Sequence, residues 1–310
     1  MNKWLKWGGY GLLALIVACI PAYWWFFAES HRALPGIYAI DIAEVRRLAD
    51  TQLGEKPLLV RVETVAHVSP PRVFVVAGDS WHSIDLPISS YEPVYRDHLA
   101  VLDTALNADV AKSMSATNFD SAAYARMSDA LAHASLIVVT HEHPDHIGGL
   151  LAQPDLKKLL AVTRLTREQV AELRPNLGKD SFAPLHLPSN VFDGYQPLDY
   201  VRYLALAPGI VLIKSPGHTP GSQMIYVRRA DGVEFLFLGD VAWIMRNVET
   251  QKEKARLVDW IADEDRMKVR EELAGLNQLH VAHPEIHMMP GHDAAAIDSF
   301  VNGGLLVRGF

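Results

Sequence analysis

The chain has 310 residues, of which 49% are hydrophobic and 21% charged, a balance that predicts an ordinary globular protein with one large domain or two small ones. Its 36 acidic and 29 basic side chains give a formal net charge of -7. Because proteins that bind a phosphate backbone usually carry a basic excess, this charge argues against nucleic acid as a partner. With one cysteine, Cys19, the folded domain can form no internal disulfide.

The first 28 residues are the most apolar part of the chain. No charged residue occurs from Trp7 to Ala28, a stretch long enough to cross a hydrocarbon core of roughly 30 Å as a helix. Lys3 and Lys6 precede it and aromatic residues crowd its far end, a pattern typical of a cytoplasmic flank and an interfacial belt. We therefore expect residues 1–28 to form a transmembrane signal anchor, with the catalytic domain extracytoplasmic, on the periplasmic side in a bacterium.

Two alternatives for this segment stay open. It has features of a cleaved signal peptide, which would give a secreted form. The run from Ile16 to Cys19 also resembles a lipobox with Cys19 as the lipidated residue. The aromatic run after Cys19 favours an uncleaved helix over both.

The remainder divides into a connector over residues 29–56 and a domain over 57–310. Apolar runs bounded by Pro, Gly and Asp predict strands at 58–68, 72–77, 98–103, 136–139, 201–207, 210–214, 222–228, 234–239 and 286–290. Helical spacing marks 121–134 and 252–279, and Thr166 with Gln169 predicts a capping box. Strands and helices alternate in two similar halves, which favours two packed sheets with helices outside, a layered α/β architecture.

One long segment of this domain shows no such periodicity. Residues 179–198 are rich in Pro, Ser, Asp and Gly, which predicts a loop. Loops of this length are often functional, so we interpret it as a candidate cover for the substrate.

The segment from Thr140 to His146 places three imidazoles and a carboxylate directly after a buried strand: His141, His143, Asp145 and His146. Four polar groups in such a place need a shared partner, and a tight loop at a strand end can turn them toward one point. Neutral imidazole nitrogen and carboxylate oxygen are ligands that zinc and neighbouring divalent metals accept. The segment therefore predicts a metal site.

Three further motifs follow strands later in the chain. They are SPGHTPGS around His218, LGD ending at Asp240, and PGHD around His292. In each, Gly or Pro beside the polar residue allows the sharp turn that presents a side chain inward. Asp293 is either an indirect partner of the site or a cap for the next helix.

This combination of HxHxDH, PGHTPGS, GD and PGH resembles the metallo-β-lactamase superfamily over residues 57–310, nearest to its glyoxalase II and lactonase branches. The resemblance implies a four-layer αββα sandwich with the site at one edge. It implies that His141, His143 and His218 bind one metal and that Asp145, His146 and His292 bind the other. It further implies that Asp240 bridges the two, and that Asp103 orients a ligand imidazole.

The resemblance implies a metal-dependent hydrolase with two divalent ions, zinc by default and iron, manganese or cobalt as alternatives. Asp145 and Asp240 are the expected catalytic residues, because Asp145 can carry a proton to the leaving group. We expect cleavage of an ester-like bond in a small molecule, with lactone or thioester ahead of phosphoester. The alternatives are a mononuclear-iron sulfur oxidoreductase and a non-catalytic membrane-tethered metal-binding module. The sequence assigns no oligomeric state.

Overall fold

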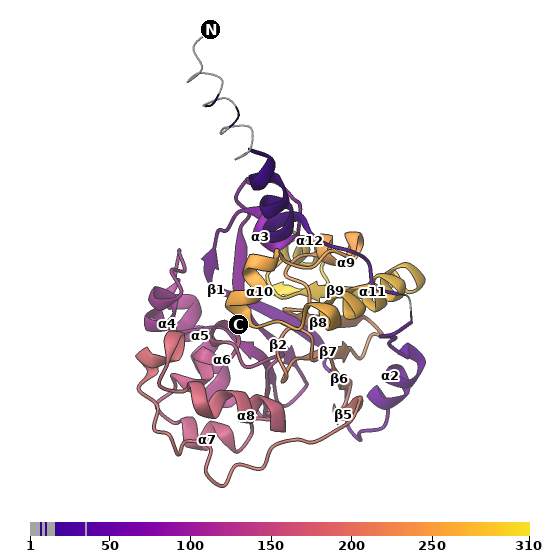
Figure 1. The fold of residues 1–310 in the computed structure, drawn as a ribbon. Coiled ribbons are helices and arrows are strands. Elements are labelled where there is room, and N and C mark those ends of the chain that lie inside the picture. Colours follow the sequence, from indigo (N-terminus) through magenta and orange to yellow (C-terminus); the bar gives the residue numbers. More distant parts are fainter. Residues whose placement is uncertain (1–6, 8–9, 11–15, 35) are drawn as a thin grey trace.

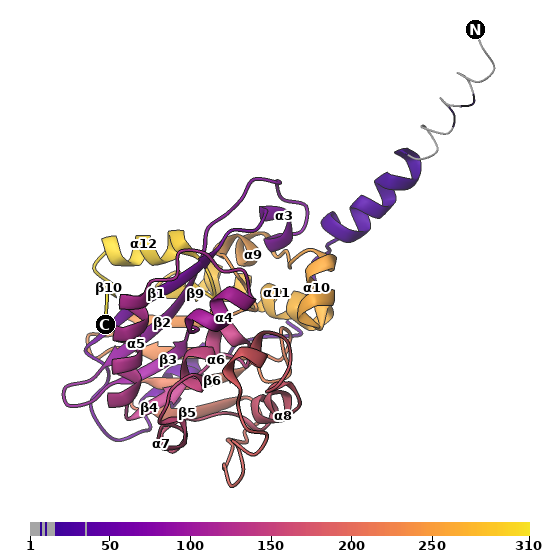
Figure 2. The ribbon, with the colours of Figure 1, turned by 90° about the vertical axis from the view of Figure 1, so that its left-hand side faces the viewer.

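Two five-stranded mixed sheets form the centre of the molecule in a computed structural model that describes residues 7, 10, 16–34 and 36–310 (Figures 1 and 2). The first sheet has the order β10-β1-β2-β3-β4 and the second the order β5-β6-β7-β8-β9. The strands are β1 (Leu59–Val68), β2 (Leu86–Val94), β3 (Ala100–Thr104), β4 (Leu136–Val138), β5 (Tyr203–Ala207), β6 (Ile210–Lys214), β7 (Gln223–Arg228), β8 (Glu234–Gly239), β9 (Ile286–Pro290) and β10 (Val307–Arg308).

The sheets pack face to face because each strand alternates its side chains between two apolar layers. Val60 and Leu102 of the first sheet and Leu212 of the second belong to one buried cluster between the sheets. Their neighbours in sequence point outward: Val101 packs in the cluster that contains α5 and α6, and Val211 in the cluster that contains α2 and α11. This gives four layers, helix, sheet, sheet and helix, and confirms the predicted αββα architecture.

Helices cover the outer face of each sheet and the edges of the sandwich (Figure 1). They are η1 (Trp24–Ala28), α2 (Ile42–Ala49), α3 (Arg72–Val75), α4 (Ala108–Ser113), α5 (Ser121–His133), α6 (Pro144–Leu151), α7 (Leu156–Leu160), α8 (Arg167–Asn176), η2 (Asp180–Leu185), α9 (Met245–Thr250), α10 (Arg256–Ala262), α11 (Arg266–Ala282) and α12 (Ala294–Asn302). The predicted capping box is present at the start of α8, where Thr166 and Gln169 cap each other.

One expectation in the first half of the domain is wrong, and one strand there was not predicted. The run 72–77, predicted as a strand, contains the short helix α3, because Pro71 precedes it and Gly78 follows it at a φ of +78°. The strand that pairs with β1 is instead β2, which contains Pro87, Pro93 and polar residues. A proline normally argues against a central strand, so this composition conceals β2 in the sequence.

The predicted helix over 252–279 is also wrong in two respects, since residues 252–255 precede the helical part. It is interrupted between α10 and α11, where Asp263 adopts a left-handed φ of +54°. Such a conformation cannot continue a right-handed helix, so the chain turns there and Asp265 caps a new helix at its N-terminus.

The membrane span expected near the N-terminus stays a prediction, because residues 8–9 and 11–15 of it lie outside the described residues. Residues 16–23 are helical and continue into η1. Within the described part of the chain, no helix is both long enough and apolar enough to cross a membrane.

Residues 29–56, expected as a connector, contact the domain at several places, including α2 and Glu29. Val45 and Ala49 of α2 are fully buried in the cluster that covers the second sheet. Glu29 accepts hydrogen bonds from Arg256 and Arg270, and its backbone oxygen accepts one from Arg266. The chain that leaves η1 is therefore fixed against α10 and α11.

Candidate metal centre

The seven predicted ligands lie together at one edge of the sandwich, where strands from both sheets end. His141 and His143 lie in the loop after β4, and Asp145 and His146 begin α6. The other three follow strands of the second sheet: His218 after β6, Asp240 after β8 and His292 after β9. The parallel pairs β3–β4 and β8–β9 end at this edge, which is why residues far apart in sequence meet there.

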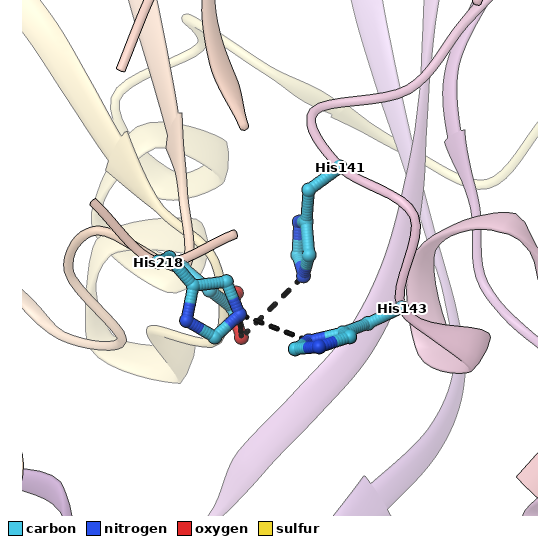
Figure 3. Close-up of side chains that lie close together, drawn as sticks. His141, His143 and His218 are labelled. Atoms are coloured by element: carbon cyan, nitrogen blue, oxygen red, sulfur yellow. Dashed lines mark hydrogen bonds and ion pairs between the residues drawn. The ribbon is translucent and has the colours of Figure 1, made fainter. Parts of the chain in front are cut away.

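The ligand atoms form two groups, each within 4.8 Å: His141, His143, His218 and Asp240 in one, Asp145, His146 and His292 in the other. Figure 3 shows the imidazole rings of His141, His143 and His218 converging on one point from two facing loops. Nε2 of His218 lies 2.9 Å from Nδ1 of His143, and Nε2 of His146 lies 3.4 Å from Nε2 of His292. The division into two groups is the one that the sequence resemblance implies.

Asp240 lies between the two groups. Its Oδ2 is 3.6 Å from Nε2 of His218 and 4.0 Å from Nε2 of His141. Its Oδ1 is 3.2 Å from Nε2 of both His146 and His292. One carboxylate thus presents a different oxygen to each group, which is the arrangement a bridging ligand requires.

Three imidazoles are held in place by a hydrogen bond at the other ring nitrogen. Nδ1 of His146 contacts Oδ2 of Asp103 at 2.9 Å, which is the contact expected of Asp103. Nδ1 of His292 donates to the backbone oxygen of Pro87 at 3.0 Å, and Nδ1 of His218 donates to Glu264. Such bonds fix the tautomer and aim Nε2 at the site.

Steric crowding explains why the LGD motif has a glycine at position 239. Gly239 has a left-handed φ of +54°, and a Cβ there would lie 2.8 Å from Cβ of Thr140. Thr140 in turn donates its backbone N–H and its hydroxyl to Asp103. A side chain at position 239 would therefore push apart the two strand ends that carry Asp240 and His141.

The donor set fits divalent metal ions. Nε2 of His141 is buried and has no hydrogen-bond partner within the described residues, although it faces Asp240. Burial lowers the pKa of His141 well below its usual value and that of His143 to about 4, so both rings are neutral and able to bind a metal. Burial opposes the charge on His146, but Asp240, Asp103 and Asp145 raise the pKa of this ring well above its usual value. The site therefore favours positive charge.

Glu264 and Lys254 belong to this centre, and the sequence analysis missed both. The Glu264 side chain is fully buried, and its carboxylate lies 2.6 Å from Nζ of Lys254. Nζ of Lys254 also donates to the backbone oxygen of Asp240 at 2.6 Å. Neither residue follows a strand or lies in a motif. In the sequence they are a lysine and a glutamate within a segment that has the pattern of a charged surface helix, and this pattern does not distinguish them from exposed residues.

A cavity of about 260 Å³ opens over the two groups. Its polar wall contains His143, Asp145, His218, Asp240 and His292. Its apolar wall contains Val68, Leu86, Met114, Pro144, Trp243, Val258 and Ala262. The loop 179–198, expected to cover the substrate, contributes no residue to this wall, so that expectation is wrong. The turn after α4 and helix α10 border the cavity instead.

Asp293 caps the helix that follows it. Its Oδ1 accepts from the backbone N–H of Ala296 in the first turn of α12, and its Oδ2 accepts from the backbone N–H of Met245. The bond to Met245 ties α12 to the loop that carries Trp243. Of the two roles left open for Asp293, the structure thus shows the helix cap.

The sequence model of the metallo-beta-lactamase superfamily matches residues 85–281, which is more than half of the chain. The chain belongs to this superfamily. It is a metal-dependent hydrolase with the fold of that family, and its cluster of His and Asp suits divalent metals. No curated protein sequence is significantly similar to this chain.

Several solved structures share the fold at low sequence identity. An N-acyl homoserine lactone hydrolase with N-hexanoyl-L-homoserine at its catalytic metal centre has a TM-score of 0.59 and 14% identity, covering 79% of this chain and 96% of that one. A probable metal-dependent hydrolase from Staphylococcus aureus has a TM-score of 0.57 and 14% identity, covering 78% and 91%. AidC, a dizinc quorum-quenching lactonase, has a TM-score of 0.55 and 14% identity, covering 79% and 90%.

Proposed function

We propose that this chain hydrolyses an ester-like bond, a lactone or thioester ahead of a phosphoester, in a small molecule that carries an apolar group. The observation that carries the proposal is the position of Asp240 between two groups of ligands beneath a cavity with one polar and one apolar wall. Lactone hydrolases among the structures of similar fold support the choice of bond.

Two divalent ions, when bound, would supply a hydroxide nucleophile at neutral pH and a Lewis acid for the carbonyl oxygen of the substrate. His141, His143 and His218 would hold one ion and Asp145, His146 and His292 the other, with Asp240 shared. Expulsion of water from the cavity by the substrate would strengthen every charge interaction inside it.

The residues of the chain then have separate tasks. Asp145 borders the cavity with its Oδ2 3.5 Å from Nε2 of His292, so its carboxylate is placed to carry a proton to the leaving group. The indole N–H of Trp243 donates to Oδ2 of Asp240 at 2.6 Å and fixes the rotamer of that carboxylate. Val258 and Met114 offer apolar surface to the rest of the substrate.

The proposal is tested by elemental analysis of the purified full chain, paired with turnover of a panel of lactone, thioester, phosphodiester and β-lactam substrates. The full chain is used because Val45 and Ala49 belong to the core. We expect about two metals per chain and turnover of the lactone or thioester. One iron per chain without hydrolysis would instead indicate a sulfur oxidoreductase. A fully metal-loaded chain that turns over no substrate would indicate a binding module.

A further inference from the structure

Aromatic side chains gather where the N-terminal helix meets the domain. Five of them, which we call the aromatic collar, are exposed despite their size: Tyr23 (44%), Trp24 (52%), Trp25 (46%), Trp81 (53%) and Trp260 (65%). The first three come from η1 and the residue before it, Trp81 from the turn after α3, and Trp260 from α10. Exposed tryptophans in a cluster are unusual on a surface that meets only water.

The collar is a fixed feature of the surface. The indole N–H of Trp81 donates to the hydroxyl of Tyr23 at 3.2 Å, and the ring of Trp81 lies 5.2 Å from that of Phe27. The neighbouring Phe26 packs edge-on against Trp260 of α10 at 5.3 Å. Two separate parts of the domain thus hold the base of this helix.

The helix before the collar is apolar and has no protein cover. Residues 16–23 are all exposed, and none of them is charged. Figures 1 and 2 both show the helix projecting away from the body beside α10. A helix that is apolar all round needs an apolar environment on every side, which a groove on one protein partner would not provide.

Consecutive side chains 23–25 point in different directions around the helix, so the collar presents aromatic rings on more than one side of its base. Tryptophan and tyrosine rings concentrate where hydrocarbon meets water, since each has an apolar body and a polar edge. Two acidic groups near the collar are already paired: Glu29 with Arg256 and Arg270, and Asp79 with Arg246 at 2.8 Å. Pairing lowers the cost of bringing these two carboxylates close to an interface.

We propose that the aromatic collar seats in the interface of a lipid bilayer and thereby holds the mouth of the catalytic cavity beside the membrane surface. Helix α10 connects the two, because Val258 and Ala262 line the cavity while Trp260 contacts Phe26 of η1. The Glu29 ion pairs fix the helix to α10 and α11, so the collar and the cavity mouth have a set orientation. This proposal does not depend on which bond the enzyme cleaves.

The test uses the full chain in vesicles of phosphatidylcholine and phosphatidylglycerol. In a Cys19→Ser background, a single cysteine is introduced by Trp260→Cys or by Trp81→Cys and labelled with a fluorophore. Leu53→Cys is the matched control, because Leu53 is 97% exposed and follows α2, which lies far from η1 in Figure 1. Lipids with a spin label near the headgroup then quench the fluorophores that they reach.

We expect the labels at positions 260 and 81 to be quenched several-fold more strongly than the label at position 53. Trp81 also packs against Phe74, so Trp260 provides a reading that does not depend on that contact. Equal quenching at all three positions would overturn the proposal. The proposal would also be overturned if the emission of the fluorophores at positions 260 and 81 shifted in the absence of lipid. A second copy of the chain would then cover the collar.

Discussion

Glu264 accepts a hydrogen bond from Nδ1 of His218, and Lys254 links this carboxylate to the backbone of Asp240. One buried ion pair therefore fixes a ligand of the first group and the residue shared by both groups. Burial alone would raise the pKa of Glu264, but Lys254 and His218 outweigh it and lower the pKa to about 2. The carboxylate is thus available as an acceptor at any ordinary pH.

Glu264→Gln should lower the metal affinity of the group that contains His218 by about 10–100-fold, because an amide binds the imidazole N–H more weakly and leaves Lys254 without its counter-charge. Competition with a chelator measures this directly. Glu55→Gln is the control, since Glu55 is 56% exposed and pairs with Arg96 on the surface. Equal affinities in the two variants would rule out the positioning role.

Asp240→Asn should reduce hydrolysis by at least about 100-fold and lower the metal content below two per chain, because an amide cannot offer an anionic oxygen to each group. Elemental analysis and turnover of the preferred substrate measure the two effects, and circular dichroism checks the fold. Asp298→Asn on α12, whose carboxylate is 64% exposed, should behave like the wild type. Retention of two metals and full turnover in Asp240→Asn would contradict the bridging assignment.

The strand-end ligands could be predicted from the sequence because each stands beside a turn residue directly after an apolar run. His218, Asp240 and His292 all have this signature, and the structure brings them together. The same runs locate most of the strands, but they miss the short β10 and also β2, in which two prolines conceal a central strand.

The partners of the ligands could not be predicted in this way. Glu264 reaches His218 only because the chain turns at Asp263, and nothing in the local pattern marks that turn. Lys254 is fully buried, although lysine is almost always exposed. Its burial depends on the ion pair with Glu264, a carboxylate ten residues away. Burial of such a pair is a tertiary effect that periodicity does not encode.

Two adjacent glycines of α6 should respond in opposite ways to alanine. A Cβ at Gly149 would lie 1.9 Å from the backbone oxygen of Thr104, so Gly149→Ala must push α6 away from β3 and should cost about 1–3 kcal/mol. A Cβ at Gly148 would have its closest contacts at 3.7 Å, so Gly148→Ala should stabilise the protein by about 0.5–1 kcal/mol through helix propensity. Urea unfolding measures both. Similar stabilities of the two variants would show that α6 can shift freely, and would contradict its tight packing against β3.

Glu29→Gln should destabilise the protein in a way that depends on pH. Burial alone would raise the pKa of Glu29, but the hydrogen bond from Arg256 and the charges of Arg270 and Arg266 lower it to about 2, against 4.5 for a free glutamate. A group whose pKa is lowered by folding stabilises the protein above the unfolded value and loses that effect as the pH falls toward the folded value.

The difference in free energy of unfolding between wild type and Glu29→Gln should therefore be constant above about pH 5 and shrink progressively from pH 4.5 toward pH 2. Urea unfolding at pH 7, 5, 4 and 3 measures it. Glu55→Gln should show little difference at any of these values, because an exposed pair contributes little. If the difference in free energy of unfolding for Glu29→Gln stayed the same from pH 7 to pH 3, the carboxylate would act through its shape and not its charge. The arginines would then not hold the N-terminal helix in place electrostatically.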